Sequence, residues 1–266
     1  MTPRDVSFDL DGRQVEAAWW GPGPDEVPTL VLLHEGLGCV ALWRNVPQRM
    51  AEATGCGVLA YSRFGYGGSD TVAVPRPLNY MHREAEEVLG RVLDAQGIRR
   101  CILVGHSDGA SIALIYAGST QDHRVRGIAL LAPHVMVEEM CVAEIARTKE
   151  RYETTDLRTK MAKYHRDVNA AFWGWNRAWL DPGFPEALQL QPEIAHVRVP
   201  ILVVQGEADP YGTMEHLRII RQEAYSPLDA LTLPGIGHSP HLEAPDATLD
   251  AVRDFADRLF RLHEPE

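Results

Sequence analysis

Ser107 lies between two glycines in the segment Gly105-His-Ser-Asp-Gly109, after an apolar stretch and before a helix-like one. A Gly-x-Ser-x-Gly segment in this context predicts a sharp turn from a strand into a helix that leaves the serine hydroxyl exposed. The positions two before and two after the serine must be small, because side chains there would collide across the bend. The hydroxyl would lie at a helix N-terminus, where unpaired N–H groups stabilise negative charge. The segment therefore favours a serine that attacks an electrophilic carbon.

A serine hydroxyl is a poor nucleophile at neutral pH, so it needs a base within hydrogen-bond reach and a third group that orients the base. Two residues near the C-terminus fit these needs, because each follows an apolar run that resembles a strand. They are Asp209, in the segment Gly206-Glu-Ala-Asp209, and His238, directly after Gly237. Loops at the carboxyl ends of parallel strands meet at one edge of a sheet. We therefore expect Asp209 and His238 to lie beside Ser107.

The elements that would position these residues are short apolar runs separated by helix-like patterns. Unbroken apolar runs are typical of strands buried on both faces of a sheet. Strands that alternate with helices need right-handed crossovers, and these produce a parallel sheet covered by helices on both faces. The sequence therefore predicts an α/β fold with a mostly parallel, doubly wound sheet. The predicted strands are Thr29–Leu33, Gly57–Tyr61, Cys101–Val104, Gly127–Leu131, Ile201–Val204 and Leu228–Leu233.

Two further patterns predict elements beside these parallel strands. The segments Val6–Leu10 and Gln14–Trp20 alternate in polarity and flank Asp11-Gly12, which predicts a hairpin with a two-residue turn at an antiparallel edge. Residues 80–97 carry one apolar stripe at helical spacing and end at Gly97. This pattern predicts a helix with a glycine just after its C-terminus.

Composition and charge narrow the class of protein. The chain has 266 residues, 45% of them hydrophobic, and a formal net charge of −11. This length suffices for a large buried core, and the negative charge argues against nucleic acid or an anionic membrane surface as a partner. The N-terminus lacks the apolar run of a secretory signal and no run is long enough to span a membrane, so we expect a cytoplasmic protein. The four cysteines are scattered without a C-x-x-C pair, so we expect neither a disulfide framework nor a metal site.

The chain resembles the α/β-hydrolase fold family, in particular its capped branch of serine esterases, lactonases and carbon–carbon hydrolases, over nearly all of its length. The resemblance implies a catalytic triad with Ser107 as nucleophile, His238 as base and Asp209 as orienting acid. Glu207 competes with Asp209, and the family's Gly-x-x-Asp spacing favours Asp209. The matching segments are His34-Glu-Gly-Leu-Gly38, Ser62-Arg-Phe-Gly-Tyr-Gly-Gly-Ser-Asp70, Gly105-His-Ser-Asp-Gly109, Gly206-Glu-Ala-Asp209, Gly237-His238 and Glu243-Ala-Pro-Asp246.

Residues 133–196 interrupt the alternation of strands and helices, because they contain only helix-like pieces. Their position after a strand whose carboxyl end faces the site predicts a helical cap inserted into a hydrolase core of residues 1–132 and 197–266. Within this cap, we expect His134, Trp173 and Trp175 to contribute to substrate binding. The alternative is that the tryptophans only pack the cap onto the core, and that His134 caps a helix.

The loop after the first predicted parallel strand departs from the family pattern. The resemblance implies that the backbone N–H groups of Gly36 and Asp108 form the oxyanion hole. Glu35 stands where the family usually has glycine, so we expect its carboxylate to turn away from the oxyanion and pair with Arg63. The alternative is a role at the substrate, since a glutamate in the equivalent loop of dienelactone hydrolases helps to activate the nucleophile.

Asp108 directly follows the predicted nucleophile. Members of the family that resemble valacyclovirase have an aspartate here, and its carboxylate lies near the ammonium group of an amino-acid ester. The resemblance therefore implies an amine-bearing substrate as one alternative. The other is an aspartate that merely stabilises the helix N-terminus.

Taken with the resemblance, these residues predict an enzyme that hydrolyses a small or medium carboxylic ester or lactone through an acyl-enzyme. Alternatives are a carbon–carbon bond hydrolase of a vinylogous diketone, an amino-acid ester hydrolase and a small-molecule receptor with a slow triad. The expected partner is a small-molecule substrate, and no cofactor is expected. The sequence leaves the oligomeric state open, a homodimer included.

Overall fold

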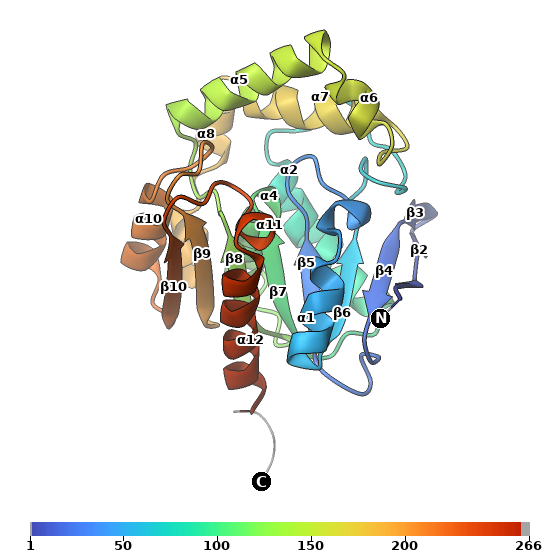
Figure 1. The fold of residues 1–266 in the computed structure, drawn as a ribbon, viewed down its shortest axis with the longest axis vertical. Coiled ribbons are helices and arrows are strands. Elements are labelled where there is room, and N and C mark those ends of the chain that lie inside the picture. Colours follow the sequence, from blue (N-terminus) through green and yellow to red (C-terminus); the bar gives the residue numbers. More distant parts are fainter. Residues whose placement is uncertain (1, 262–266) are drawn as a thin grey trace.

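The computed structural model describes residues 2–261, and its centre is a sheet of eight strands in the order β1-β4-β6-β5-β7-β8-β9-β10 (Figure 1). Strands β6, β5, β7, β8, β9 and β10 run parallel to one another, while β4 is antiparallel to β6 and β1 to β4. The predicted α/β fold with a mostly parallel sheet is therefore confirmed. The strands are β1 (Arg4–Asp5), β4 (Ala17–Trp20), β5 (Thr29–Leu33), β6 (Gly57–Tyr61), β7 (Cys101–His106), β8 (Val125–Leu131), β9 (Ile201–Gly206) and β10 (Leu228–Leu233).

The predicted N-terminal hairpin is present, but it stands apart from the main sheet. Strands β2 (Phe8–Leu10) and β3 (Arg13–Val15) pair with each other, and both turn residues, Asp11 and Gly12, have positive φ angles of 55° and 79°. The predicted second strand is split at Glu16, whose backbone N–H donates to Ser69 Oγ and whose carbonyl accepts from Ser62 N–H. The chain bends there, and β4 then joins the main sheet.

One prediction about burial is wrong. Strand β10 is expected to be buried on both faces, yet none of its residues is fully buried: Asp229, Ala230 and Thr232 are exposed, and its leucines are partly buried. It is the edge strand and pairs only with β9, so Asp229 and Thr232 face solvent. Sequence alone did not place this strand at the edge.

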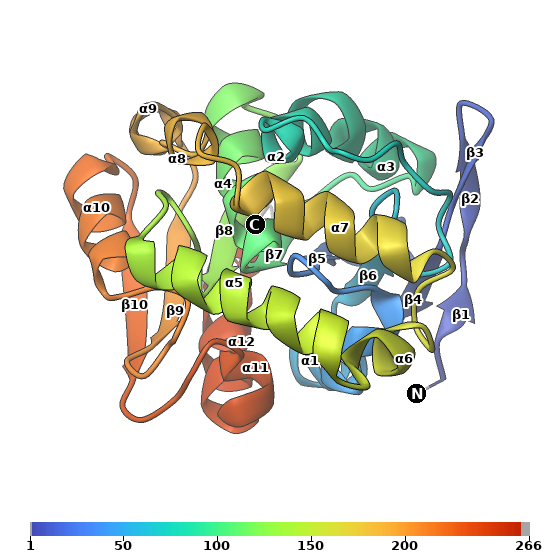
Figure 2. The ribbon, with the colours of Figure 1, turned by 90° about the horizontal axis from the view of Figure 1, so that it is seen from above.

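Helices cover both faces of the sheet, as Figure 2 shows from above. Strand β5 serves both cores: Leu30 and Leu32 pack with the helices of one face, and Val31 and Leu33 with those of the other. The first face carries α1 (Val46–Thr54) and α12 (Pro245–Arg261), near the short η1 (Val40–Trp43) and α11 (Pro240–Glu243). The second face carries α2 (Tyr80–Arg83), the π-helical turn η2 (Glu84–Leu89), α3 (Gly90–Ala95), α4 (Asp108–Ser119), α9 (Gln191–His196) and α10 (Glu215–Glu223).

The predicted helix over residues 80–97 is confirmed as the continuous series α2, η2 and α3. Its end has the expected geometry, because Gly97 has a φ of +64° and Ile98 N–H donates to the carbonyl of Leu93. This bond pattern closes the last turn of a helix through a left-handed residue.

Four helices lie above the carboxyl ends of the parallel strands (Figure 1). We call these the upper helices: α5 (Glu139–Thr154), α6 (Leu157–Met161), α7 (Val168–Trp179) and α8 (Phe184–Ala187). Helices α5 and α7 run side by side across the top, and α9, next along the chain, packs on α4 beside the sheet. No helix within residues 2–261 is long and apolar enough to cross a membrane.

Candidate active site

Ser107 occupies the sharp turn between β7 and α4. Its φ is +54°, a strained value for a residue with a side chain. A Cβ atom on Gly105 would collide with the carbonyl of Gly109, and one on Gly109 would collide with the carbonyl of Leu33 at the end of β5. Both glycines are therefore required, Gly109 because helix α4 begins directly against the neighbouring strand.

Ser107, His238 and Asp209 form a hydrogen-bonded chain. His238 Nε2 lies 2.9 Å from Ser107 Oγ, and His238 Nδ1 lies 2.8 Å and 3.0 Å from the carboxylate oxygens of Asp209. A neutral imidazole has one donor and one acceptor nitrogen. With Nδ1–H donating to Asp209, Nε2 is free to accept the hydroxyl hydrogen of Ser107.

Asp209 is buried and held as a carboxylate. Burial raises the pKa of its carboxyl group, but hydrogen bonds from His238, Tyr211 N–H and Gln205 Nε2 outweigh burial and bring the pKa below its ordinary value. An ionised, fixed Asp209 keeps the His238 ring in the orientation described above. Glu207, the competing acid, is exposed.

The loops that carry Asp209 and His238 are joined by their backbones. Glu207 N–H donates to Leu233, and Ala208 N–H donates to Ile236. Gly206 lies so close to this second loop that a Cβ atom there would collide with the carbonyls of Ile236 and Gly237. Two segments about thirty residues apart in sequence thus form one unit at the sheet edge.

Gly36 and Asp108, whose backbone N–H groups are the expected oxyanion donors, line the same cavity as Ser107. Among residues 2–261, neither N–H donates a hydrogen bond to the protein. Asp108 is the first residue of α4, where helix geometry leaves the N–H without an internal acceptor. Both groups are therefore available to a ligand atom beside Ser107.

The expected ion pair between Glu35 and Arg63 does not form. Arg63 is buried and donates to the backbone carbonyls of His34 and Glu35, the latter at 3.0 Å. The Glu35 carboxylate points the other way, with Oε2 3.7 Å from Nδ1 of His106. The strand register explains this: Leu33 is level with Tyr61 on one side and with Gly105 on the other. Arg63 therefore meets the Glu35 backbone from β6, and the side chain of Glu35 faces the end of β7.

A cavity of about 250 Å³ lies beside Ser107, between the strand ends and the upper helices. The predicted substrate residues Glu35, His134 and Trp175 line it, but Trp173 does not. Trp173 lies on another side of α7, against Tyr152 and Phe172. The reason is helical geometry, since two residues correspond to a rotation of about 200°. The lining residues are Glu35, Gly36, Leu37, His106, Ser107, Asp108, His134, Cys141, Ile145, Thr148, Trp175, Trp179, Tyr211, His238 and Ser239.

The cavity carries two carboxylates and, among its lining residues, neither lysine nor arginine. Burial raises the pKa of Glu35, but the nearby imidazole of His106 outweighs it, so the pKa lies well below the ordinary value. Burial, together with the neighbouring His216 and His238, lowers the pKa of His134 well below its usual range. His134 therefore brings no positive charge at neutral pH.

Asp108 is almost fully buried, and only one of its oxygens has a partner. The hydroxyl of Tyr80 donates to Oδ2, while Trp179 Nε1 donates to that hydroxyl at 3.1 Å. Oδ1 has no hydrogen-bond partner. Burial raises the pKa of Asp108, and the charge of Arg63 and the bond from Tyr80 act in the opposite direction.

Sequence reasoning missed several residues of the site. The ring of Tyr211 lies 4.7 Å from that of His238, and Tyr211 lines the cavity. The hydroxyl of Tyr80, in α2, donates a hydrogen bond to Asp108. Neither belongs to a motif, so no sequence signal marked them. His106 did carry a signal, because it directly precedes Ser107.

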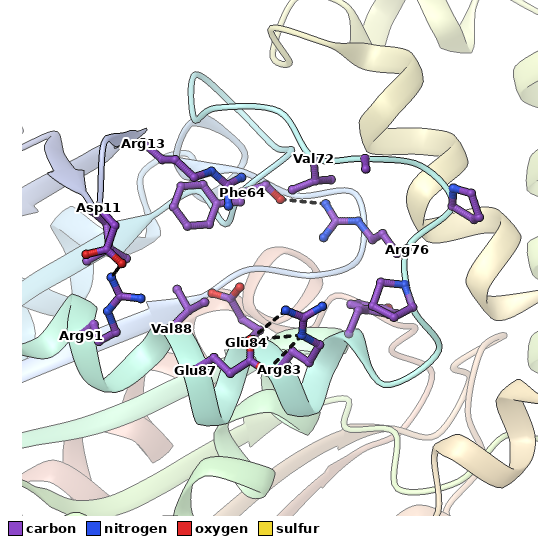
Figure 3. A pocket seen from close by; sticks show the side chains of 15 residues that line it. Asp11, Arg13, Phe64, Val72, Arg76, Arg83, Glu84, Glu87, Val88 and Arg91 are labelled. Atoms are coloured by element: carbon purple, nitrogen blue, oxygen red, sulfur yellow. Dashed lines mark hydrogen bonds and ion pairs between the residues drawn. The ribbon is translucent and has the colours of Figure 1, made fainter.

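A second cavity, of about 360 Å³, lies between the hairpin and the helix that begins at Tyr80 (Figure 3). Its rim holds two ion pairs, Arg91 with Asp11 and Arg83 with Glu87. Tyr80 is among the residues that line this cavity, but Ser107 and His238 are not. The residues suited to acyl chemistry therefore belong to the first cavity.

Comparison with known proteins places this geometry in a family. Residues 30–251 match the α/β-hydrolase family. Proline iminopeptidase from Lactobacillus delbrueckii subsp. bulgaricus is 28% identical over 177 residues, which cover 62% of this chain and 59% of that protein. The chain thus spans less than two thirds of that relative's length.

Solved structures share the fold at low sequence identity. The 2-hydroxy-6-oxo-6-phenylhexa-2,4-dienoate hydrolase of Rhodococcus sp. strain RHA1 aligns with a TM-score of 0.79 at 17% identity, covering 97% of this chain and 99% of that one. The enol-lactonase of Burkholderia xenovorans LB400 aligns with a TM-score of 0.70 at 21% identity, covering 94% and 99%. The family match over most of its length shows that this chain belongs to the α/β-hydrolase family, and the two solved structures share its fold.

Proposed function

We propose that the protein hydrolyses a small or medium carboxylic ester or lactone through an acyl-enzyme. The observation that carries this proposal is the hydrogen-bonded chain from Ser107 Oγ through His238 to Asp209. In this proposal residues 1–132 and 197–266 belong to the hydrolase core and residues 133–196 to the cap, of which α5 and α7 cover the cavity above Ser107.

The reaction follows from the geometry. Ser107 Oγ attacks the carbonyl carbon while His238 Nε2 takes its proton, and the new oxyanion accepts from the N–H groups of Gly36 and Asp108. His238 then gives the proton to the departing alkoxide oxygen, leaving an acyl group on Ser107. Water attacks this acyl group with His238 again as base, and the acid leaves as Ser107 regains its proton.

The charge of the cavity favours an ester or lactone over a carbon–carbon hydrolase substrate. The Rhodococcus neighbour is named for a dienoate, which is an anion. The cavity of this chain has Glu35 and Asp108 in its lining and no cationic side chain there. An anionic substrate placed beside these two carboxylates would be repelled and would lack a cationic partner.

A second candidate is an amino-acid ester, because Asp108 lines the cavity and its Oδ1 is buried without a hydrogen-bond partner. An ammonium group would supply that partner and the compensating charge. The curated relatives are named proline iminopeptidases, a name that is compatible with an amine in the substrate.

The test is an assay of esters, lactones and amino-acid esters, together with labelling by a fluorophosphonate. We expect Ser107→Ala to abolish turnover and labelling while the thermal midpoint hardly changes, since only a hydroxyl is lost. Turnover of p-nitrophenyl acetate by Ser107→Ala at the wild-type rate contradicts the proposal. A small-molecule receptor would show tight ligand binding with turnover far slower than ligand release.

Asp108→Asn separates the two substrate candidates. For an amino-acid ester we expect kcat/KM to fall by ~10–100-fold, the size of a lost charged hydrogen bond. The matched neutral ester, with the amine replaced by hydrogen, should be hydrolysed at nearly the unchanged rate. Equal losses on both substrates would rule out ammonium recognition by Asp108.

A further inference from the structure

His106, the residue before Ser107, is hydrogen-bonded to the backbone of the proposed base. Its Nε2 lies 2.8 Å from the carbonyl oxygen of His238, and the side chain is nearly inaccessible. A carbonyl only accepts hydrogen bonds, so Nε2 carries the hydrogen. The strand that carries the nucleophile thus holds the loop that carries the base.

The other nitrogen of the same ring faces Glu35. Glu35 Oε2 lies 3.7 Å from His106 Nδ1, and the lowered pKa described above keeps this carboxylate ionised at neutral pH. At 3.7 Å this contact is longer than a hydrogen bond, and Nδ1 has no hydrogen-bond partner within the described residues. Both groups beside the ring are acceptors, so the carboxylate attracts the ring in this orientation only when both ring nitrogens carry hydrogen. Glu35 also directly precedes Gly36, so the oxyanion loop joins the same chain of contacts.

Ring packing supports this arrangement. The His106 ring lies 5.1 Å from the ring of His238 and 4.5 Å from that of His241. His241 lies three residues further on, in α11, packs edge to face on His106, and makes no hydrogen bond to His238 within the described chain. A substitution of His241 therefore changes ring packing beside His106 without removing the hydrogen bond from His106 to His238.

We propose that His106 is a positioning residue that fixes the backbone of His238 through its Nε2–H, and that Glu35 orients the His106 ring for this bond. The proposal rests on the proposed function, in which His238 is the base. Without the bond, the His238 loop can shift and carry Nε2 away from Ser107 Oγ. A displacement of about 1 Å in an active site lowers the rate by about 100-fold.

The experiment compares two substitutions at one position. His106→Phe keeps a ring but removes the donor, and His106→Gln keeps an N–H donor at a similar reach. We expect His106→Phe to lower kcat and the rate of fluorophosphonate labelling by ~30–100-fold with KM changed less than ~3-fold. His106→Gln should recover most of both rates.

His241→Phe is the matched control, because it makes the same replacement in the adjoining ring. Its kcat should stay within ~3-fold of wild type. Thermal midpoints of all three variants show whether folding is retained at the assay temperature. Wild-type kcat in folded His106→Phe, or an equal loss in His106→Gln and His106→Phe, would overturn the proposal.

A double-mutant cycle tests the part assigned to Glu35. Glu35→Gln alone should lower kcat by ~10-fold, and in the His106→Phe background it should have almost no further effect. Full additivity of the two losses would show that Glu35 acts by another route, such as substrate contact. A wild-type protein that neither hydrolyses esters nor is labelled at Ser107 would refute the proposed function itself. Unchanged labelling of the His106→Phe variant would refute the positioning role of His106 and leave the proposed function standing.

Discussion

The two sides of the cavity beside Ser107 are built by different means. Below it, the strand ends hold Ser107, Asp209 and His238 through backbone contacts and hydrogen bonds. Above it, α5 and α7 contribute mainly apolar and aromatic side chains, and of these Trp179 is tied to the lower side by a hydrogen-bonded chain, through Tyr80 to Asp108. Within the proposed function, the lower side would determine which reaction occurs, while the upper side would determine which molecule fits.

Backbone contact leaves the lower side little freedom. Gly105, Gly109 and Gly206 all lie against neighbouring carbonyls at distances where a Cβ atom would collide. Elements packed this closely cannot shift without losing several contacts at once. The positions of the reactive atoms are therefore fixed within narrow limits, as catalysis requires.

The upper side is joined to the core at a few points. Trp175 packs directly over Gly36, where a Cβ atom would collide with the indole nitrogen. His165, between α6 and α7, accepts from Gly67 N–H at 3.0 Å and donates to the carbonyl of Leu37 at 3.0 Å. One buried histidine thus connects the upper helices to the loops after both β5 and β6.

The largest expected effect tests the lower side. Asp209→Asn should lower kcat by ~10³–10⁴-fold, because an amide cannot hold His238 in the required tautomer. Glu207→Gln, the control in the same exposed loop, should lower kcat by less than ~3-fold. Steady-state kinetics on an ester substrate measure both, and the reverse order would make Glu207 the acid.

A tenfold effect is expected on the upper side. Trp175→Leu should raise KM by ~10-fold with little change in kcat, because the lost ring area contacts substrate in the ground state and the transition state alike. Trp173→Leu, two positions away on the same helix and outside the cavity, should leave KM unchanged. A drop in kcat for Trp175→Leu with constant KM would mean that the upper side also shapes the reaction.

The smallest expected effect concerns stability and pH. Burial lowers the pKa of His34, His134 and His241 well below the usual value. The unfolded chain therefore binds protons below about pH 6.5 that the folded chain does not, so stability is lost as pH falls. His241→Phe should reduce the slope of the free energy of unfolding against pH by up to about 1.4 kcal/mol per pH unit, which corresponds to the uptake of one proton.

Urea unfolding at several pH values between 5 and 7 measures that slope. The comparison uses the slope and not the absolute stability, because the new phenyl ring also changes packing. An unchanged slope in His241→Phe would mean that His241 takes up its proton in the folded protein as readily as in the unfolded chain.

Much of the fold was predictable because strands and helices follow local periodicity. Apolar runs gave the parallel strands nearly to the residue, and Asp11-Gly12 marked the hairpin turn. The nearness of Ser107, Asp209 and His238 was also predictable, since each follows a parallel strand and parallel strands end at one edge. Their catalytic roles stay predictions that the variants above test.

Contacts between distant segments were not predictable in the same way. The sequence alone identified Glu35 as a carboxylate at a position where the family usually has glycine. Which residue this carboxylate faces depends on the register of β5 between β6 and β7, and this register turns it toward His106 and not toward Arg63. Likewise, the choice between Trp173 and Trp175 depended on how α7 is rotated over the sheet. A local pattern specifies the period of an element, whereas the partner of each side chain depends on how separate elements pack.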